Sequence, residues 1–387
     1  MSALSFPLFQ PTRLSPPPKT RPRTPLRLGF LTPHNPFDRR AFSGTCFHAA
    51  NALQAQPDLT LSILGHKRHP GRLARYFKHP SQPDVSRLDL SNIDLVVGMV
   101  ATPLLKDLIA SHPTVPFIHV TDATPAYLRE VYGWKTPPDA DEDEAWVARN
   151  AVTNVYSSDV MARRAHTDLN LPGIVTDTLS FGLNSVEKPD ICPEKPSLEQ
   201  VKLLFVGTDW MRKGGDVAVA ATKQLLAAGH NVSLTVVGQT PDGFQGQNIH
   251  ATGYLDKNKR RDRKKLARLF AESHLLLLPS RADCTPMVIA EAMAQGTPVI
   301  ASDVGGISSM IAGAGRLLPA FSPPEDWAAA IVDMTRDRMA YDILSDASFD
   351  KSIQNFSWTL WAERIAHLGR EAVETRLHRD LKASVCT

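Results

Sequence analysis

Short runs of consecutive apolar residues alternate along this chain with stretches in which apolar and polar positions follow a helical period. Apolar runs of this kind predict strands that are buried on both faces, and the amphipathic stretches predict the helices that cover them. We expect strands at 27–32, 59–64, 93–98, 116–120, 153–156, 174–179, 201–206, 232–237, 275–278 and 298–301. The alternation predicts an α/β protein with doubly wound parallel sheets.

The length of 387 residues fits two domains of ordinary size. We expect residues 1–26 to be a disordered lead-in, because they are rich in Pro, Arg and Lys and have no apolar signal core. A first domain then spans 27–186, a linker with three prolines spans 187–200, and a second domain spans 201–345. Residues 346–387 are expected to form helices that pack back toward the first domain. Two domains joined in this way enclose a cleft, where ligands often bind.

The segment 283–306 carries the most informative pattern. It follows the apolar run 275–278, so it begins at the carboxyl end of a predicted strand, where α/β sheets bind ligands. Thr285 can cap a helix there, and a proline follows it in the first helical turn. Helix starts bind anions, and Asp283 and Glu291 bracket this one. The pattern fits a phosphate with a polyhydroxylated group on either side, as in a nucleotide-sugar.

Two further loops follow predicted strands and offer contacts for a diphosphate. Residues 206–215 combine glycines, which let a backbone approach a ligand, with the cations Arg212 and Lys213. A solvated basic turn before a helix is the alternative interpretation. Residues 43–45 (Ser-Gly-Thr) open a helix in the other half of the chain, and a simple helix cap is the alternative there. Facing each other across a cleft, these loops would clamp a diphosphate.

Polar side chains also follow the strand predicted at 116–120. Asp122 is placed to orient a sugar or an acceptor hydroxyl, unless it caps the helix that Pro125 begins. We interpret His119 as a strand histidine with a hydrogen-bonded neighbour. The acidic run 139–144 has a DxD spacing suited to a divalent cation, but it follows two prolines and precedes a helical pattern. We therefore interpret it as a helix start that its carboxylates stabilise.

Charge, cysteine content and missing motifs narrow the function classes. The formal net charge of +3 is too small to indicate nucleic acid, and the most basic run, 257–265, has no interleaved aromatic residues. That run is either a solvated loop and helix face or a surface for peripheral contact with an anionic membrane. The four cysteines show no metal-ligand spacing and are typical of a reduced, cytoplasmic protein, and no apolar run is long enough to span a membrane. The dinucleotide-binding, Walker, nucleophile-elbow and zinc-protease motifs do not occur.

Together these segments resemble the family 4 retaining glycosyltransferases, or glycosyl transferases group 1. The resemblance covers nearly the whole chain after Arg27 and is strongest over residues 205–306. The segments that carry it are 43–45, 121–124, 181–184, 206–214, 236–238, 252–255, 283–291 and 296–306. The resemblance implies the GT-B fold, in which two Rossmann-like domains with doubly wound parallel sheets face a central cleft.

The resemblance also implies a role for each matching residue. Glu291 is expected to bind the nucleotide ribose, and Asp283 the hydroxyls of the donor sugar. Lys213, with Arg212 beside it, is expected to neutralise the diphosphate, which Gly44 approaches from the first domain.

The chain departs from the family pattern at three places. Asp283 replaces the usual glutamate and reaches one methylene less far. Thr208 stands where a basic residue is frequent, and Arg212 is expected to compensate. Thr-Pro replaces the frequent Phe-Gly at the helix start, and Pro286 has no N–H. The remaining backbone donors for the phosphates are those of Thr285, Met287 and Val288.

The expected function is the retaining transfer of a hexosyl group from a nucleotide-diphosphate sugar to a hydroxyl of a glycan, lipid-linked or small-molecule acceptor. The candidate catalytic residues are Asp122, Arg212, Lys213 and Asp283. The family needs no cofactor or metal, and no nucleic-acid partner is expected. Two alternatives stay open: a catalytically silent nucleotide-sugar-binding partner subunit, and a nucleotide-sugar epimerase of the same fold.

Overall fold

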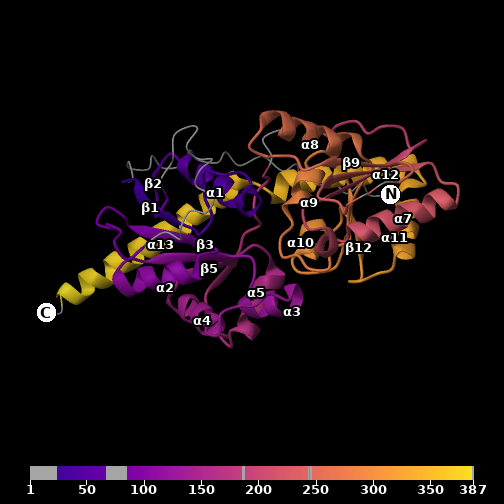
Figure 1. Ribbon diagram of the computed structural model, residues 1–387. Coiled ribbons are helices and arrows are strands. Elements are labelled where there is room, and N and C mark those ends of the chain that lie inside the picture. The colour runs from indigo at the N-terminus through magenta and orange to yellow at the C-terminus, as the bar shows by residue number, and fades with distance from the viewer. Residues whose placement is uncertain (1–23, 67–84, 185–187, 243, 245, 386–387) are drawn as a thin grey trace, which may run out of the picture.

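Two α/β domains make up the protein, each built on a six-stranded parallel sheet (Figure 1). The computed structural model describes residues 24–66, 85–184, 188–242, 244 and 246–385. Residues 1–23 of the expected lead-in and 185–187 at the domain junction lie outside the described residues. The predicted doubly wound parallel sheets are confirmed.

The first sheet has the strand order β2-β1-β3-β4-β5-β6. Its strands are β1 (Leu26–Leu31), β2 (Leu59–Ile63), β3 (Leu95–Met99), β4 (Phe117–Thr121), β5 (Thr153–Tyr156) and β6 (Thr176–Thr178). The helices around it are α1 (Thr45–Gln54), α2 (Thr102–Ser111), α3 (Pro125–Tyr132), α4 (Ala140–Asn150) and α5 (Asp159–Asp168). Every residue of β3 and β4 is buried, as expected for a sheet covered on both faces, although His119 and Thr121 interrupt the apolar run of β4.

The second sheet has the order β12-β11-β10-β7-β8-β9. Its strands are β7 (Val201–Gly207), β8 (Val232–Gly238), β9 (Ile249–Gly253), β10 (Leu275–Leu278), β11 (Val299–Ser302) and β12 (Gly315–Leu318). Its helices are α6 (Trp210–Lys213), α7 (Gly215–Ala227), α8 (Arg260–Glu272), α9 (Met287–Met293), α10 (Ile307–Ile311), α11 (Pro324–Thr335) and α12 (Arg338–Asn355). The strand order reverses between β7 and β10, which pair directly, so the loops after these two strands open the crevice of this sheet.

The apolar pattern does not predict two of these strands, β9 and β12. Both lie at the edges of the second sheet. In β9 only Ile249 is fully buried, and no residue of β12 is, so neither strand presents a continuous apolar run. Edge strands need less apolar surface because only one side pairs with a neighbour.

The last helix, α13 (Trp358–Val385), returns to the first domain and contacts α1 and β1 (Figure 1). The boundary expected after residue 345 falls inside α12, which contacts α9 and α11 of the second domain. The chain therefore crosses back only at 356–357. There the Trp358 indole N–H donates to Asn184 Oδ1 at 3.0 Å, and the Asn184 amide donates to the Ser43 carbonyl and the Thr45 hydroxyl.

Part of the expected linker is anchored to the second domain by Lys195. Its ammonium is buried and donates to the carbonyls of Phe270, Ala271 and Ser273 at 3.1–3.2 Å and to the Thr297 hydroxyl at 2.6 Å. These carbonyls close the end of α8, where a cation also complements the negative end of the helix dipole. Among the described helices, none is both long and apolar enough to cross a membrane.

Candidate functional site

A cavity of about 340 Å³ lies between the two domains, at the carboxyl ends of both sheets. All predicted site residues except Gly44 line it, and Gly44 lies between two residues that do, Ser43 and Thr45. The lining residues predicted from sequence are Asp122, Thr208, Arg212, Lys213, Asp283, Thr285, Met287, Val288 and Glu291. The structure thus brings together residues from both halves of the chain; their chemical roles stay predictions.

The first acid, Asp283, is buried and forms an ion pair with Lys213. Its Oδ2 also accepts from the Ser280 hydroxyl at 3.1 Å. Lys213 ends the short helix α6, and Gly214 follows it with a φ of +76°. A Cβ at Gly214 would collide with the carbonyl of Pro279 at the end of β10, so only glycine lets this loop lie against the neighbouring strand.

The Arg212 guanidinium is held at the rim of the cavity by three contacts. It donates to Asp209 Oδ2 at 3.0 Å and to the Ala282 carbonyl at 2.9 Å, and it lies 5.4 Å from the ring centroid of Tyr132. Asp209 also caps α6 by accepting from the Arg212 N–H. Arg212 is thus oriented beside Asp283 by groups of both domains.

The second acid, Glu291, lies on α9 and pairs with Lys257, a residue that sequence reasoning assigned to the surface run 257–265. Glu291 is only 4% exposed, yet its carboxylate reaches the cavity. Lys257 follows the 252–255 segment at the carboxyl end of β9, and that position could have identified it. Of the remaining run, Lys259, Arg260, Arg261, Lys264 and Lys265 are exposed.

Asp122 follows β4 and faces the same cavity as Asp283. Burial raises the pKa of Asp122, a hydrogen bond from its own backbone partly offsets this, and the charge of Asp283 raises it again, so that the pKa lies at about 7. Asp122 does not cap α3: the Thr124 hydroxyl accepts from the Tyr127 N–H and is the N-cap. The carboxyl of Asp122 is therefore available to a ligand.

The start of α9 differs from the prediction. The helix begins at Met287 with Pro286 as its N-cap, and no side chain caps it. The expected cap by Thr285 is therefore wrong: its hydroxyl lies 2.5 Å from the Ser157 hydroxyl of the first domain. The reason is that a cross-domain partner competes with the helix end for a short hydroxyl side chain. Met287 and Val288 still present N–H groups that have no acceptor within the helix.

The first domain contributes a strained turn to the cavity. Phe42, Ser43 and Gly44 have φ values of 47°, 56° and 89°, and α1 begins directly after them. Non-glycine residues at positive φ cost free energy and concentrate at functional sites. At Gly44 a Cβ would lie 2.8 Å from the Arg39 carbonyl, so a side chain has no room there.

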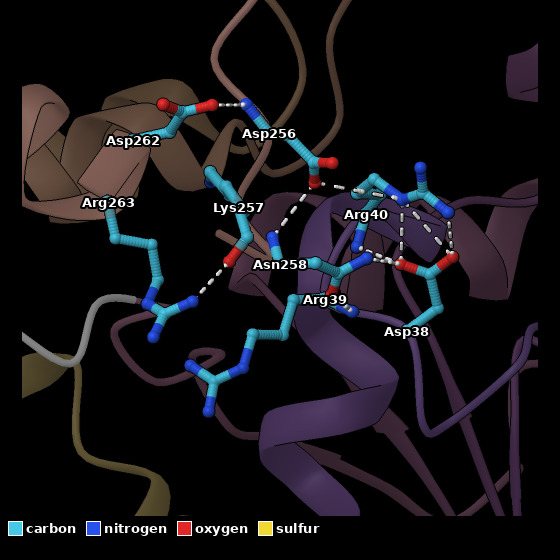
Figure 2. Close-up of polar contacts among 8 residues, drawn as sticks. All are labelled: Asp38, Arg39, Arg40, Asp256, Lys257, Asn258, Asp262 and Arg263. Atoms are coloured by element: carbon cyan, nitrogen blue, oxygen red, sulfur yellow. Dashed lines mark hydrogen bonds and ion pairs between the residues drawn. The ribbon is translucent and has the colours of Figure 1, made fainter. Parts of the chain in front are cut away.

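A pair of loops joins the domains at the edge of the cavity (Figure 2). The Asn258 amide donates to Asp38 Oδ1 at 2.7 Å, and its oxygen accepts from the Arg39 N–H at 3.1 Å. Burial opposes the charge of Asp38, but hydrogen bonds from Arg40 and Asn258 lower its pKa to about 2. On the other side, the Tyr127 hydroxyl donates to the Asp283 carbonyl at 3.1 Å. The cleft is therefore bridged on two sides.

Two other sequence interpretations concern residues outside the cavity. His119 is fully buried in β4, with Asn154 Oδ1 at 3.1 Å and the Thr102 hydroxyl at 3.3 Å, so it is a hydrogen-bonded strand histidine as predicted. The acidic run 139–144 forms the start of α4, with three carboxylates in its first turn. The helix-start interpretation is confirmed.

Comparisons with known proteins give matches for the second domain in sequence and for both domains in fold. Residues 200–337 match the family model described as glycosyl transferases group 1. The D-inositol 3-phosphate glycosyltransferase of Corynebacterium aurimucosum is 26% identical over 217 residues, which cover 53% of this chain and 51% of that protein. The protein of the same name from Nocardioides sp. is 35% identical over 195 residues, covering 44% of this chain and 41% of that one. The chain thus spans about half or less of the length of these relatives.

Two solved structures share the arrangement of both domains. A sucrose-phosphate synthase from Thermosynechococcus elongatus superposes with a TM-score of 0.70 at 16% identity, covering 91% of this chain and 100% of that one. The Anabaena protein HepE, solved with UDP and glucose, gives a TM-score of 0.63 at 14% identity, covering 88% of this chain and 98% of that one. At these identities the likeness concerns the fold.

Proposed function

We propose that this chain, a GT-B protein whose second domain is of the glycosyl transferases group 1 family, moves a hexosyl group from a nucleotide-diphosphate sugar to a hydroxyl acceptor, with retention of configuration. The observation that carries the proposal is the convergence of Lys213, Asp283 and Glu291 with the starts of α1 and α9 on one cavity. Residues far apart in the chain meet there only because both sheets point their carboxyl ends at the cleft.

The proposed donor orientation follows from the order of charges along the cavity. The diphosphate lies near Lys213 and the N–H groups of Met287 and Val288, and the ribose lies at Glu291. Asp283 then accepts from hydroxyls of the donor sugar. Lys213 and Lys257 each pair with one of these carboxylates, so a bound diphosphate competes with the acids for the ammonium groups.

In the proposed reaction, negative charge grows on the departing diphosphate as the glycosidic bond breaks. Lys213, Arg212 and the two helix starts provide positive potential that is already oriented before the reaction. The acceptor hydroxyl attacks from the face of the leaving group, and the diphosphate takes up the hydroxyl proton. The bridged cleft limits access of water, which would otherwise hydrolyse the donor.

On the acceptor side, we propose that Asp122 and two aromatic rings receive the acceptor. Trp134 is 55% exposed and lies 4.8 Å, centroid to centroid, from Tyr132, and both line the cavity. The backbone N–H of Trp134 donates to the Leu128 carbonyl, which fixes the turn after α3. Aromatic faces beside a carboxylate suit a ring that carries both C–H and hydroxyl groups.

The relatives and the fold support a nucleotide-sugar donor. The curated relatives are named for glycosyl transfer to D-inositol 3-phosphate, and the HepE structure contains UDP and glucose.

The test is a thermal-shift panel of UDP-, GDP- and ADP-sugars, followed by turnover of the best ligand with mixed acceptors. A ligand at about 100 times its Kd stabilises a protein by about 2.7 kcal/mol, which such a panel detects. NMR of the product's anomeric proton then tests retention. Binding without turnover supports the silent partner subunit, and a changed sugar without any acceptor supports the epimerase. Binding of no nucleotide-sugar would refute the proposal.

A further inference from the structure

Two arginines from different domains converge beside the Asp38–Asn258 contact (Figure 2). Arg39 belongs to the loop before α1, and Arg263 belongs to the first turns of α8. Their guanidinium groups lie in the same region below Lys257 in this view.

Arg39 has no hydrogen-bond acceptor or acidic partner for its side chain among the residues that the structure describes. Its Nη1 is buried without a partner, and its guanidinium lies 4.3 Å from the ring centroid of Phe47. Burial, followed by the charge of Arg263, lowers the pKa of Arg39, which indicates that the two guanidinium groups are close enough to repel each other.

Only some of the hydrogen-bond donors of Arg263 have an acceptor in the part of the chain that the structure describes. Its Nη1 donates to the Lys257 carbonyl at 2.8 Å, while its Nε is buried and has no partner within the described part of the chain. Buried donors without acceptors are rare in folded proteins, and an ion or water usually accounts for them. Here each domain supplies one such donor to the same region.

The acids nearby are engaged elsewhere. Asp38 accepts from Arg40 and Asn258, and Asp256 lies 4.0 Å from Arg40. Asp262 accepts from the Asp256 N–H, and Glu291 pairs with Lys257. The two guanidinium groups therefore lack a counter-charge within the part of the molecule described.

The surroundings confirm a positive local potential. Burial and then the charges of Arg39, Lys257 and Arg263 lower the pKa of His48 to about 4, so this imidazole stays neutral at pH 7. A cluster of like charges at a domain interface repels, and an anion between them would remove that repulsion. Planar guanidinium groups with unused N–H donors match the oxygens of a phosphate.

We propose that Arg39 and Arg263 form a binding site for a phosphate-like oxyanion that bridges the two domains, separate from the site of the donor diphosphate. Lys213 and Asp283 line only the large cavity, which Arg39 also lines, whereas Arg263 lines a smaller cavity that shares Lys257 and Glu291 with the large one. Because one arginine comes from each domain, the bound anion holds the domains together and favours the bridged cleft. The site is independent of the proposed function.

The first experiment measures the melting temperature of the full chain with inorganic phosphate, and with sodium chloride at equal ionic strength. Phosphate near 100 times its Kd should raise the melting temperature by about 3 °C more than chloride does. Arg39→Gln and Arg263→Gln should each reduce the shift to that of chloride. Arg268→Gln is the matched control, because Arg268 lies on the same helix and pairs with Glu272 at the surface. A phosphate-specific shift that persists in both glutamine variants would overturn the proposal.

Melting temperatures measured with phosphate at saturating UDP distinguish the proposed anion site from the site of the donor diphosphate. If the anion has its own site, phosphate still raises the melting temperature of the UDP complex; if UDP abolishes the shift, the anion occupies the diphosphate site and the proposal is wrong. Arg263→Lys, which keeps the charge but loses the planar fork, should recover part of the phosphate shift if the protein folds normally. Glucose 6-phosphate and glucose distinguish the sources, since a phosphorylated metabolite should act at lower concentration than free phosphate. If the protein binds phosphate but no nucleotide-sugar, the anion site is supported and the proposed function is refuted.

Discussion

Replacing Lys213 by methionine tests the site and its energetics together. The Lys213 and Asp283 side chains are 14% and 8% exposed, so their ion pair is largely shielded from water. Removing one partner of a buried pair leaves an uncompensated charge and typically costs about 3–5 kcal/mol. The Ser280 hydroxyl, which also donates to Asp283, softens the loss. We expect Lys213→Met to cost about 3 kcal/mol of stability.

The double variant Lys213→Met/Asp283→Asn separates stability from binding. It removes both charges at once, so most of the lost stability should return, because replacing both partners is far less costly than orphaning one. The affinity for UDP should not return, because the ammonium that is proposed to face the diphosphate is still missing. A hydrogen bond to a charged group contributes about 1.5–3 kcal/mol, so its loss should raise the Kd for UDP by about 10- to 150-fold.

Urea unfolding of the wild type and both variants, with UDP titration by calorimetry, measures these quantities. A double variant that is no more stable than Lys213→Met would show that Asp283 is not left as a buried charge. Unchanged UDP affinity in both variants would refute the placement of the diphosphate at Lys213.

Three further predictions concern other parts of the molecule. Burial raises the pKa of Asp122 from 3.8 to about 7, so the folded protein binds a proton that the unfolded chain has lost. The free energy of unfolding of the wild type should therefore decline as the pH rises from about 4 to 7, by at most about 1.4 kcal/mol per pH unit. Urea unfolding of Asp122→Asn should show a flatter decline. An unchanged slope in this variant would contradict the raised pKa of Asp122. Lys195→Met should lower the free energy of unfolding by about 2–4 kcal/mol in thermal or urea unfolding, because it removes the hydrogen-bond donors at the end of α8. The control Lys223→Met, at an exposed position, should cost little stability. Equal losses of stability in the two variants would refute this role of Lys195. Asn258→Ala removes two hydrogen bonds between the domains. It should weaken UDP binding by about 2- to 10-fold and increase the radius of gyration measured by solution scattering. If neither change is observed, this contact does not hold the cleft closed.

The sequence predicts the central strands of both sheets and both edge strands of the first sheet, but it misses the two edge strands of the second sheet. The run 275–278 is an unbroken apolar segment and forms β10 with the predicted bounds, because a strand buried on both faces favours apolar side chains. In contrast, β9 and β12 pair on one side only and carry exposed polar residues. Their existence depends on the neighbours that they pair with, which no local pattern records.

The same distinction applies to the site. Glycines, cations and acids after apolar strands predicted which loops would meet, since parallel strands present their carboxyl ends at one edge. The position of Lys257 after β9 indicated that it could reach the site, but its pairing with Glu291 joins two separate elements and no local pattern records it. The Thr285–Ser157 contact was beyond prediction, because Ser157 lies in the other domain. Pairings across a cleft follow from how two domains dock, which periodicity does not encode.

The link from Trp358 through Asn184 to the turn before α1 has a mechanical consequence. Both stretches of chain that pass between the domains are fastened at this one point, so any rotation of one domain against the other pivots close to it. Ser43 and Thr45 lie at the pivot and move least, whereas the Asp38 loop is free to swing once its contact with Asn258 breaks. Opening at the Asp38 loop would thus widen the cavity there while the turn before α1 stays almost still.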